Sequence, residues 1–233
     1  HIETISNNDL RLNLGKGAGG VFVERVELRA PRGWATIAYG CDGQEFATSV
    51  GHTNATKHAT SAHELRLSAR TEWWAASEVI ILASNPPLVR RRQTYRFLKT
   101  CDVAIHPGWR IATGDNVRYT FPLRAHEQPL AGLRAMRSDV TWALPLPFHV
   151  WHNGKWVALY GVDRTGSQGT IDFLPPDRLR VYFPDTAKQG AHLGSLPEIP
   201  QTMRFEAGAE LTLTEVLSAK PLGKDDEPLL EAE

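Results

Sequence analysis

Hydrophobic side chains recur at every second position along much of this chain, and that period constrains its fold more than any other feature. Side chains of a β-strand point alternately to opposite faces, so the period describes strands with one buried and one solvated face. Gly, Pro, Asn or Asp separate the alternating runs, as in turns between strands. We therefore predict an all-β, or mainly β, fold: an antiparallel β-sandwich or supersandwich with at most one or two short helices.

The expected strands cover residues 21–29, 63–69, 79–83, 89–97, 117–123, 148–151, 156–162, 179–183 and 210–217. In the first of them Phe22, Val26 and Leu28 share a face. Along 89–97, the alternation places residues 90, 92 and 96, all arginines, on one solvated basic face, which explains the charge run without any ligand. Asn153-Gly154 between two apolar runs predicts a hairpin, because a type I′ turn needs positive φ at both central positions.

Helical spacing is scarce, and the best candidate is about ten residues from Pro129. No internal repeat or low-complexity linker divides the chain, so we expect a single β-sandwich domain over residues 1–219, followed by a tail or linker over residues 220–233. Acids and a proline in that tail resemble the first turn of a helix. Two readings stay open: a disordered acidic tail, or the entry to a further domain of a longer protein.

Charge and composition limit the classes of partner that we expect for this chain. The chain has 26 basic and 26 acidic residues, so no net field draws it to nucleic acid, and neither nucleic acid nor a membrane is expected as a partner. No apolar run reaches the roughly 18 residues of a membrane helix. The lack of a signal peptide favours a cytoplasmic address, but the chain begins with His1 and secretion stays open. Cys41 and Cys101 read as two buried thiols, with one bridge between them also possible.

Sequence motifs for phosphate, metal or nucleophilic chemistry are weak. The glycine-rich residues 15–20 lack the lysine-hydroxyl ending of a phosphate loop and read as a turn between the first two strands. His149 and His152 are three apart, and strand residues at that spacing face opposite sides, so we expect no metal and no cofactor. The aspartates at 163, 172, 177 and 185 cluster in the later strands, where each reads as a turn or cap residue, and the catalytic residues stay unknown.

Seven tryptophans are many for a chain of this size. Aromatic rings stack on the apolar faces of sugars, and polar neighbours can hydrogen-bond the hydroxyl groups around such a platform. Packing in the core is the alternative for any one of these rings. The residues that we expect to contact a sugar are Trp109, His149, Trp151, His152, Asp163 and Arg164.

The segments 88–97 and 106–110, with 205–213 as a closing strand, resemble the β-supersandwich domains that precede the catalytic barrel in several glycoside hydrolases. Those domains are similar in fold to galactose mutarotase. The resemblance implies an accessory N-terminal domain that contacts or helps close a sugar site, with carbohydrate and a C-terminal catalytic domain as partners.

Two alternatives to the accessory domain stay open. One is a free-standing mutarotase-like sugar epimerase. Mutarotases use histidines as acid and a glutamate as base, which would fall here to a carboxylate with His106, His149 or His152. Their Asn-His and His-x-Tyr-Phe patterns are absent from this sequence. The other alternative is a noncatalytic interaction domain that binds no small ligand.

Overall fold

The computed structural model describes residues 3–40, 45–46, 48–51, 54–58, 61–103, 105, 108–111, 118–123, 148–152, 155–162, 180–182, 192–194 and 203–223. These residues form two large antiparallel sheets and one small one, and none of them is helical. The prediction of an all-β sandwich is confirmed. The helix expected after Pro129 and the turn residues Asn153 and Gly154 lie outside the described residues.

The first sheet has seven strands and holds the N-terminal part of the chain. Its spatial order is β1 (Glu3–Ser6), β2 (Leu10–Gly17), β3 (Gly20–Ala30), β4 (Gly33–Tyr39), β10 (Gly108–Ile111), β15 (His192–Gly194) and β14 (Arg180–Tyr182). Within the glycine-rich residues 15–20, residues 18 and 19 form a turn that joins the paired strands β2 and β3, as expected. That turn follows the second strand rather than the first, because β1 precedes it.

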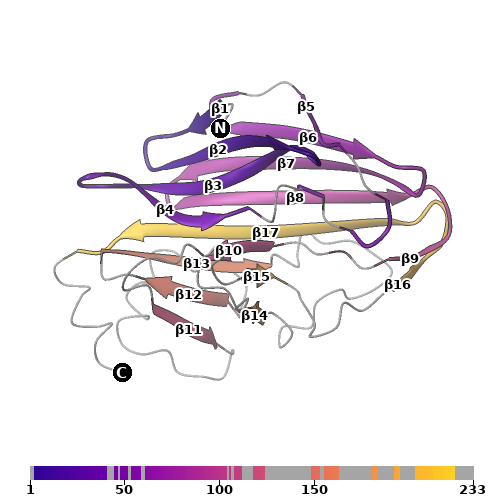
Figure 1. The fold of residues 1–233 in the computed structure, drawn as a ribbon. Coiled ribbons are helices and arrows are strands. Elements are labelled where there is room, and N and C mark those ends of the chain that lie inside the picture. The colour runs from indigo at the N-terminus through magenta and orange to yellow at the C-terminus, as the bar shows by residue number, and fades with distance from the viewer. Residues whose placement is uncertain are drawn as a thin grey trace.

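The second sheet has eight strands, and the long strand β17 runs between β8 and β13 (Figure 1). Its spatial order is β11 (Arg118–Leu123), β12 (Phe148–His152), β13 (Trp156–Val162), β17 (Glu210–Pro221), β8 (Pro87–Phe97), β7 (Trp74–Ser84), β6 (Glu64–Arg70) and β5 (Thr56–Lys57). Strands β12 and β13 pair antiparallel, which confirms the predicted hairpin. A small sheet pairs β9 (Cys101–Val103) with β16 (Met203–Phe205).

The core lies between the two large sheets, where β2 and β3 contact β7, β8 and β17. Residues 65, 67 and 69 of β6 face inward as the sequence predicted. Trp74, Tyr95 and Phe46 pack against one another in this core, with ring centroids 5.5 to 6.4 Å apart. Large aromatic rings bury much apolar area, so this contact contributes strongly to the packing of the two sheets.

One strand departs from the predicted alternation. Phe22 of β3 is half-buried, whereas its neighbour Val23 is fully buried. Strand β3 has an extra residue, Glu24, opposite Asn13 and Leu14 of β2, and this bulge reverses the alternation between Val23 and Val26. Glu27 stands between Val26 and Leu28 and so faces away from them. It is buried on that face, where its carboxylate accepts hydrogen bonds from Arg11 and Asn13.

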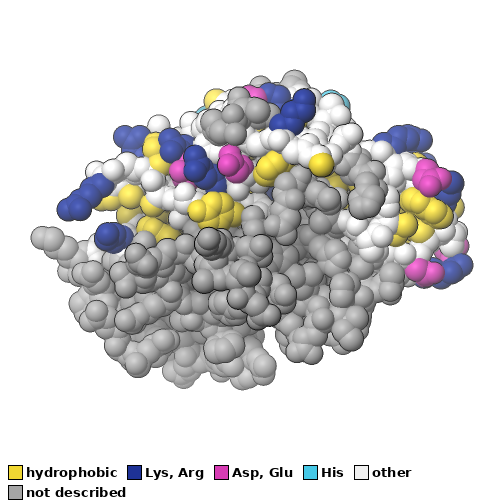
Figure 2. Space-filling view, viewed as in Figure 1, with side chains coloured by type: hydrophobic (Ala, Val, Ile, Leu, Met, Phe, Trp, Pro, Cys, Tyr) yellow, Lys and Arg dark blue, Asp and Glu magenta, His cyan; other side chains and the backbone are white. Residues whose placement is uncertain are grey.

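The surface of the described residues carries both signs of charge. Lys and Arg side chains gather toward the two ends of the molecule in the view of Figure 2, with Asp and Glu side chains beside them. Arg11 and Arg29 lie over the ring of Trp34, at 4.6 and 5.4 Å from its centroid. In the described part of the chain, no helix is long and apolar enough to cross a bilayer.

Candidate functional site

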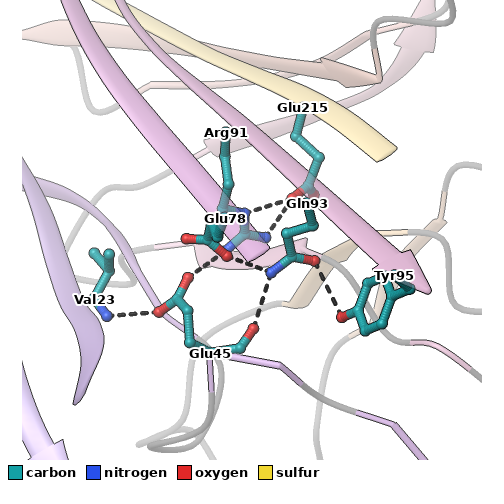
Figure 3. Close-up of polar contacts among 7 residues, drawn as sticks. All are labelled: Val23, Glu45, Glu78, Arg91, Gln93, Tyr95 and Glu215. Atoms are coloured by element: carbon teal, nitrogen blue, oxygen red, sulfur yellow. Dashed lines mark hydrogen bonds and ion pairs between the residues drawn. The ribbon is translucent and has the colours of Figure 1, made fainter. Parts of the chain in front are cut away.

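The strongest concentration of acid–base side chains in the described residues lies between the two sheets (Figure 3). Glu78 of β7 and Gln93 of β8 are cross-strand partners, and so are Arg91 of β8 and Glu215 of β17. All four occupy the inward phase of their strands, and each side chain is almost fully buried. We call these four residues, with Glu45, the Arg91 cluster.

Arg91 is the centre of the cluster. Its Nε donates to Glu215 Oε2 at 2.6 Å, and its Nη1 donates to Glu45 Oε1 at 3.2 Å. A second guanidinium nitrogen also contacts Glu215. Because a buried charge is costly unless it is paired, the two carboxylates and the guanidinium stabilise one another in the interior.

Glu45 joins the two sheets. Its Oε2 accepts a hydrogen bond of 2.7 Å from the backbone N–H of Val23, on β3 of the seven-stranded sheet. Its backbone carbonyl accepts a 3.0 Å bond from Gln93 Nε2, on the eight-stranded sheet. Trp109 of β10 adds a further link, since the Arg91 guanidinium lies 4.3 Å from the centroid of its ring. The cluster therefore fixes how one sheet sits on the other.

Glu78 is the member of the cluster whose pKa is clearly shifted. Burial raises its pKa well above the ordinary value of 4.5, and the nearby charge of Glu45 raises it further, against the lowering effect of Arg91. Gln93 Nε2 donates to Glu78 Oε2 at 2.5 Å, while Glu78 Oε1 has no partner among the described residues. Burial also raises the pKa of Tyr95, whose hydroxyl donates to Gln93 Oε1 at 3.4 Å.

Chemically, the cluster combines a carboxyl group whose protonated form burial favours with two glutamates that the Arg91 guanidinium binds. A carboxyl group with a raised pKa beside charged partners is a common feature of acid–base sites. The side chains are closed to solvent, however, with Arg91 at 4% and Glu215 at 2% exposure. In the described part of the chain, no three metal-ligating side chains come together.

The structure separates the residues that the sequence nominated for sugar contact. Trp109 is buried beneath Arg91, and its Nε1 has no partner among the described residues. His149, Trp151 and His152 lie along β12, where they pair in register with Tyr160, Ala158 and Val157 of β13. Asp163 and Arg164 lie outside the described residues. Sugar contact by these six residues stays a prediction.

Of the other residues that the sequence singled out, some lie in the core and some lie outside the described residues. Trp74 and Trp156 pack in the core, which is the alternative weighed for single tryptophans. The acid–base candidates Asp163, Asp172, Asp177, Asp185 and His106 lie outside the described residues. Cys101 is a buried free thiol, and burial raises its pKa.

The Arg91 cluster was missed by reasoning from the sequence. A signal for it was present, because Arg91 falls on the same phase of β8 as the apolar residues Val89 and Tyr95. The same holds for Glu78 among the inward residues of β7 and for Glu215 between Leu213 and Leu217. A charged residue on the apolar phase of a strand implies a buried partner, and reading the arginine run as one solvated face hid that signal.

No protein-family model matches the chain, and no curated protein matches it. Solved structures do match in fold. A putative aldose 1-epimerase from Escherichia coli K12 superposes with a TM-score of 0.53 at 10% identity, covering 94% of this chain and 98% of that one. A protein from Synechocystis sp. PCC 6803 also gives 0.53 at 10% identity, covering 94% and 96%.

A β-arabinopyranosidase gives a TM-score of 0.48 at 9% identity, covering 94% of this chain and 40% of that one, which is too distant to support a conclusion. At 10% identity, the two better matches define the fold of the chain and nothing about its activity. The chain has the galactose-mutarotase-like β-supersandwich fold, as the resemblance in its sequence implied.

Proposed function

We propose that this chain is a carbohydrate-associated β-supersandwich domain that acts as the accessory N-terminal domain of a glycoside hydrolase and contacts or helps close a sugar site. The fold that it shares with a protein described as a putative aldose 1-epimerase supports the association with carbohydrate. A C-terminal catalytic domain of the same polypeptide is the partner that this function requires.

The observation that carries an accessory rather than a catalytic role is the closure of the Arg91 cluster. Its carboxylates are bound by the guanidinium and by backbone groups, and its side chains are almost fully buried. An acid–base pair has to reach within hydrogen-bond distance of the sugar oxygen that it protonates or deprotonates. The cluster is therefore suited to holding the two sheets together, and sugar contact is assigned to residues elsewhere.

We assign that contact to strand β12, with His149, Trp151 and His152 as its first members. These three residues lie on one strand between β11 and β13. Tryptophan supplies a flat apolar face for a sugar ring, and histidine supplies a hydrogen bond to its hydroxyl groups.

A thermal-melting screen of the chain against neutral sugars tests this proposal, because a ligand that binds only the folded state raises the melting temperature. At a hundred times the dissociation constant the stabilisation is about 2.7 kcal/mol, or roughly 5–10 °C for a domain of this size. We expect the shift to be lost in Trp151→Ala and kept in Trp34→Ala, which alters the seven-stranded sheet. A panel of mono- and oligosaccharides that leaves the melting temperature unchanged contradicts the proposal.

The second candidate is a mutarotase-like epimerase, which the fold shared with a protein described as a putative aldose 1-epimerase favours. Ring opening of an aldose needs one group to accept the proton of the O1 hydroxyl and another to give a proton to the ring oxygen. A histidine from His106, His149 or His152 would act with a carboxylate in these two roles. NMR of freshly dissolved α-galactose decides: conversion above the buffer rate that His149→Ala abolishes supports the epimerase, and conversion at the buffer rate excludes it for that sugar.

A further inference from the structure

A serine and a histidine near the β5 edge of the eight-stranded sheet form a contact that neither the Arg91 cluster nor the proposed function uses. His58 Nε2 lies 2.5 Å from Ser68 Oγ. Ser68 belongs to β6, and His58 directly follows the short edge strand β5. A serine hydroxyl within hydrogen-bond distance of an imidazole nitrogen is the arrangement of a nucleophile with its general base.

The backbone holds the histidine beside β6. Strand β5 pairs with β6 in a register that sets Lys57 opposite Leu67. The N–H of His58 extends this ladder by donating to the carbonyl oxygen of Arg66 at 2.9 Å. Lys57 also forms an ion pair with Glu3 of β1, which anchors the edge strand to the other sheet. Because groups on paired strands keep their geometry better than groups on loops, the contact between the two side chains is built into the sheet.

Solvent reaches this pair of side chains. Residues 65, 67 and 69 of β6 face inward, so Ser68 faces outward, where it is half-buried, and His58 is exposed. The outward residues of the neighbouring strand β7 beside them are small or apolar: Ala75, Ser77 and Val79. A substrate can therefore reach Ser68 Oγ without any rearrangement of the sheet, in contrast to the closed carboxylates of the Arg91 cluster.

Arg66 supplies a cation on the same face. It lies two residues before Ser68 on β6 and so points to the same side, at a spacing of about 6.8 Å along the strand. Its side chain is 59% exposed, and its Nε binds the carboxylate of Glu64. The remaining nitrogens of a guanidinium donate in a fixed fork, so they can stabilise negative charge on an oxygen atom held between Arg66 and Ser68.

We propose that Ser68 and His58 form a catalytic pair that hydrolyses esters of short carboxylic acids. Ser68 Oγ forms a bond to the ester carbonyl carbon while its proton passes to His58 Nε2. The bond from that carbon to the alcohol oxygen then breaks, and the alcohol leaves with the proton from His58. Water releases the acid from Ser68 by the same two steps, and Arg66 stabilises the oxyanion in each. The inference goes beyond the proposed function and does not depend on it.

Fluorophosphonate labelling of the full chain, followed by peptide mapping, tests the pair. The reagent forms a phosphorus–oxygen bond to an activated serine and releases fluoride, while the serine proton passes to the base. We expect the label on Ser68, and we expect His58→Gln to slow labelling by about 10²- to 10⁴-fold, the usual contribution of a general base. Ser77→Ala is the matched control, because Ser77 is exposed and is the cross-strand partner of Ser68. It should be labelled like the wild type, whereas a wild type without label on Ser68, or equal rates in His58→Gln, overturns the inference.

Hydrolysis of p-nitrophenyl acetate tests the complete reaction. We expect nitrophenolate release above the buffer rate in the wild type and in Ser77→Ala, and release at the buffer rate in Ser68→Ala. Release that Ser68→Ala keeps assigns the catalysis to another group and overturns the role of Ser68. Release at the buffer rate in the wild type overturns the esterase even where Ser68 takes the label. Sugar binding is tested separately by the melting screen, so a failure here leaves the proposed function standing.

Discussion

Replacing Arg91 with methionine removes the cation at the centre of the cluster and keeps a side chain of similar length. Glu215 and Glu45 lose their ion pairs with Arg91, and Trp109 loses the guanidinium that lies 4.3 Å from its ring centroid. Both carboxylates then stay in the interior beside an apolar side chain. The neighbouring Arg92→Met is the matched control, because Arg92 points outward from the same strand.

The size of the effect follows from burial. Arg91 is 4% exposed and Glu215 is 2% exposed, so water cannot replace the lost partner without the sheets opening. Breaking a buried ion pair by removing one partner costs about 3–5 kcal/mol, whereas a substitution on an exposed face usually changes stability by less than about 0.5 kcal/mol. We therefore expect Arg91→Met to lower the free energy of unfolding by about 3–5 kcal/mol and Arg92→Met to leave it nearly unchanged.

Urea unfolding followed by tryptophan fluorescence measures this difference. With a slope of roughly 1–3 kcal/mol/M, the midpoint of Arg91→Met falls by more than about 1 M. Adding Glu215→Gln to Arg91→Met removes one of the stranded charges, so the double variant should lose less than the sum of the two single losses. A loss below about 1 kcal/mol for Arg91→Met, or additive losses in the double variant, refutes the view that these charges stabilise one another.

Three further predictions concern single residues. Because the pKa of Glu78 is raised in the folded state, the wild type loses stability as pH rises above about 4.5. Urea titrations should therefore show the unfolding free energy of Glu78→Gln rising relative to that of the wild type by about 1.4 kcal/mol per pH unit, from pH 5 toward the native pKa. An equal pH dependence in the two proteins contradicts this. Burial raises the pKa of Glu27, but the hydrogen bonds from Arg11 and Asn13 outweigh burial, so the pKa lies below its ordinary value. Glu27→Gln should therefore cost about 1–3 kcal/mol of stability at pH 7, and melting curves should show that cost shrinking below pH 4.5. Gly20→Ala would place a Cβ 2.3 Å from the Ala55 carbonyl oxygen, whereas Gly33→Ala meets nothing within 4 Å, so calorimetry should give Gly20→Ala the lower melting temperature.

The strands that the sequence predicted best are those with a clean alternation over a long run. Strand β8 begins and ends close to the expected 89–97, and its basic face lies outward as expected. Strand β14 lies within the predicted run 179–183. The short strands β9 and β15 were not predicted, because each depends on a neighbouring strand for its hydrogen bonds and three residues carry too little pattern. The bulge at Glu24 of β3 changed the face of Phe22, and only the pairing register reveals that bulge.

The candidate site was harder to predict because its partners are distant in sequence. Glu45 lies 46 residues from Arg91, and Glu215 lies 124 residues from it. Alternation alone puts Arg91 on the inner face of β8, but the order of strands in the sheet decides which carboxylate meets it. The sequence carries no sign that β17 returns to lie beside β8, and that return brings Glu215 to Arg91.

Native-state hydrogen exchange at the Val23 amide tests the closure of the Arg91 cluster most directly. This N–H donates to Glu45 Oε2 at 2.7 Å and so reports on the contact between the two sheets. If the cluster is a closed element of the core, the amide exchanges only through global unfolding, and its opening free energy equals the unfolding free energy from urea. An opening free energy several kcal/mol smaller, in an otherwise folded chain, would show that the sheets part at this point and that the cluster is accessible to a ligand.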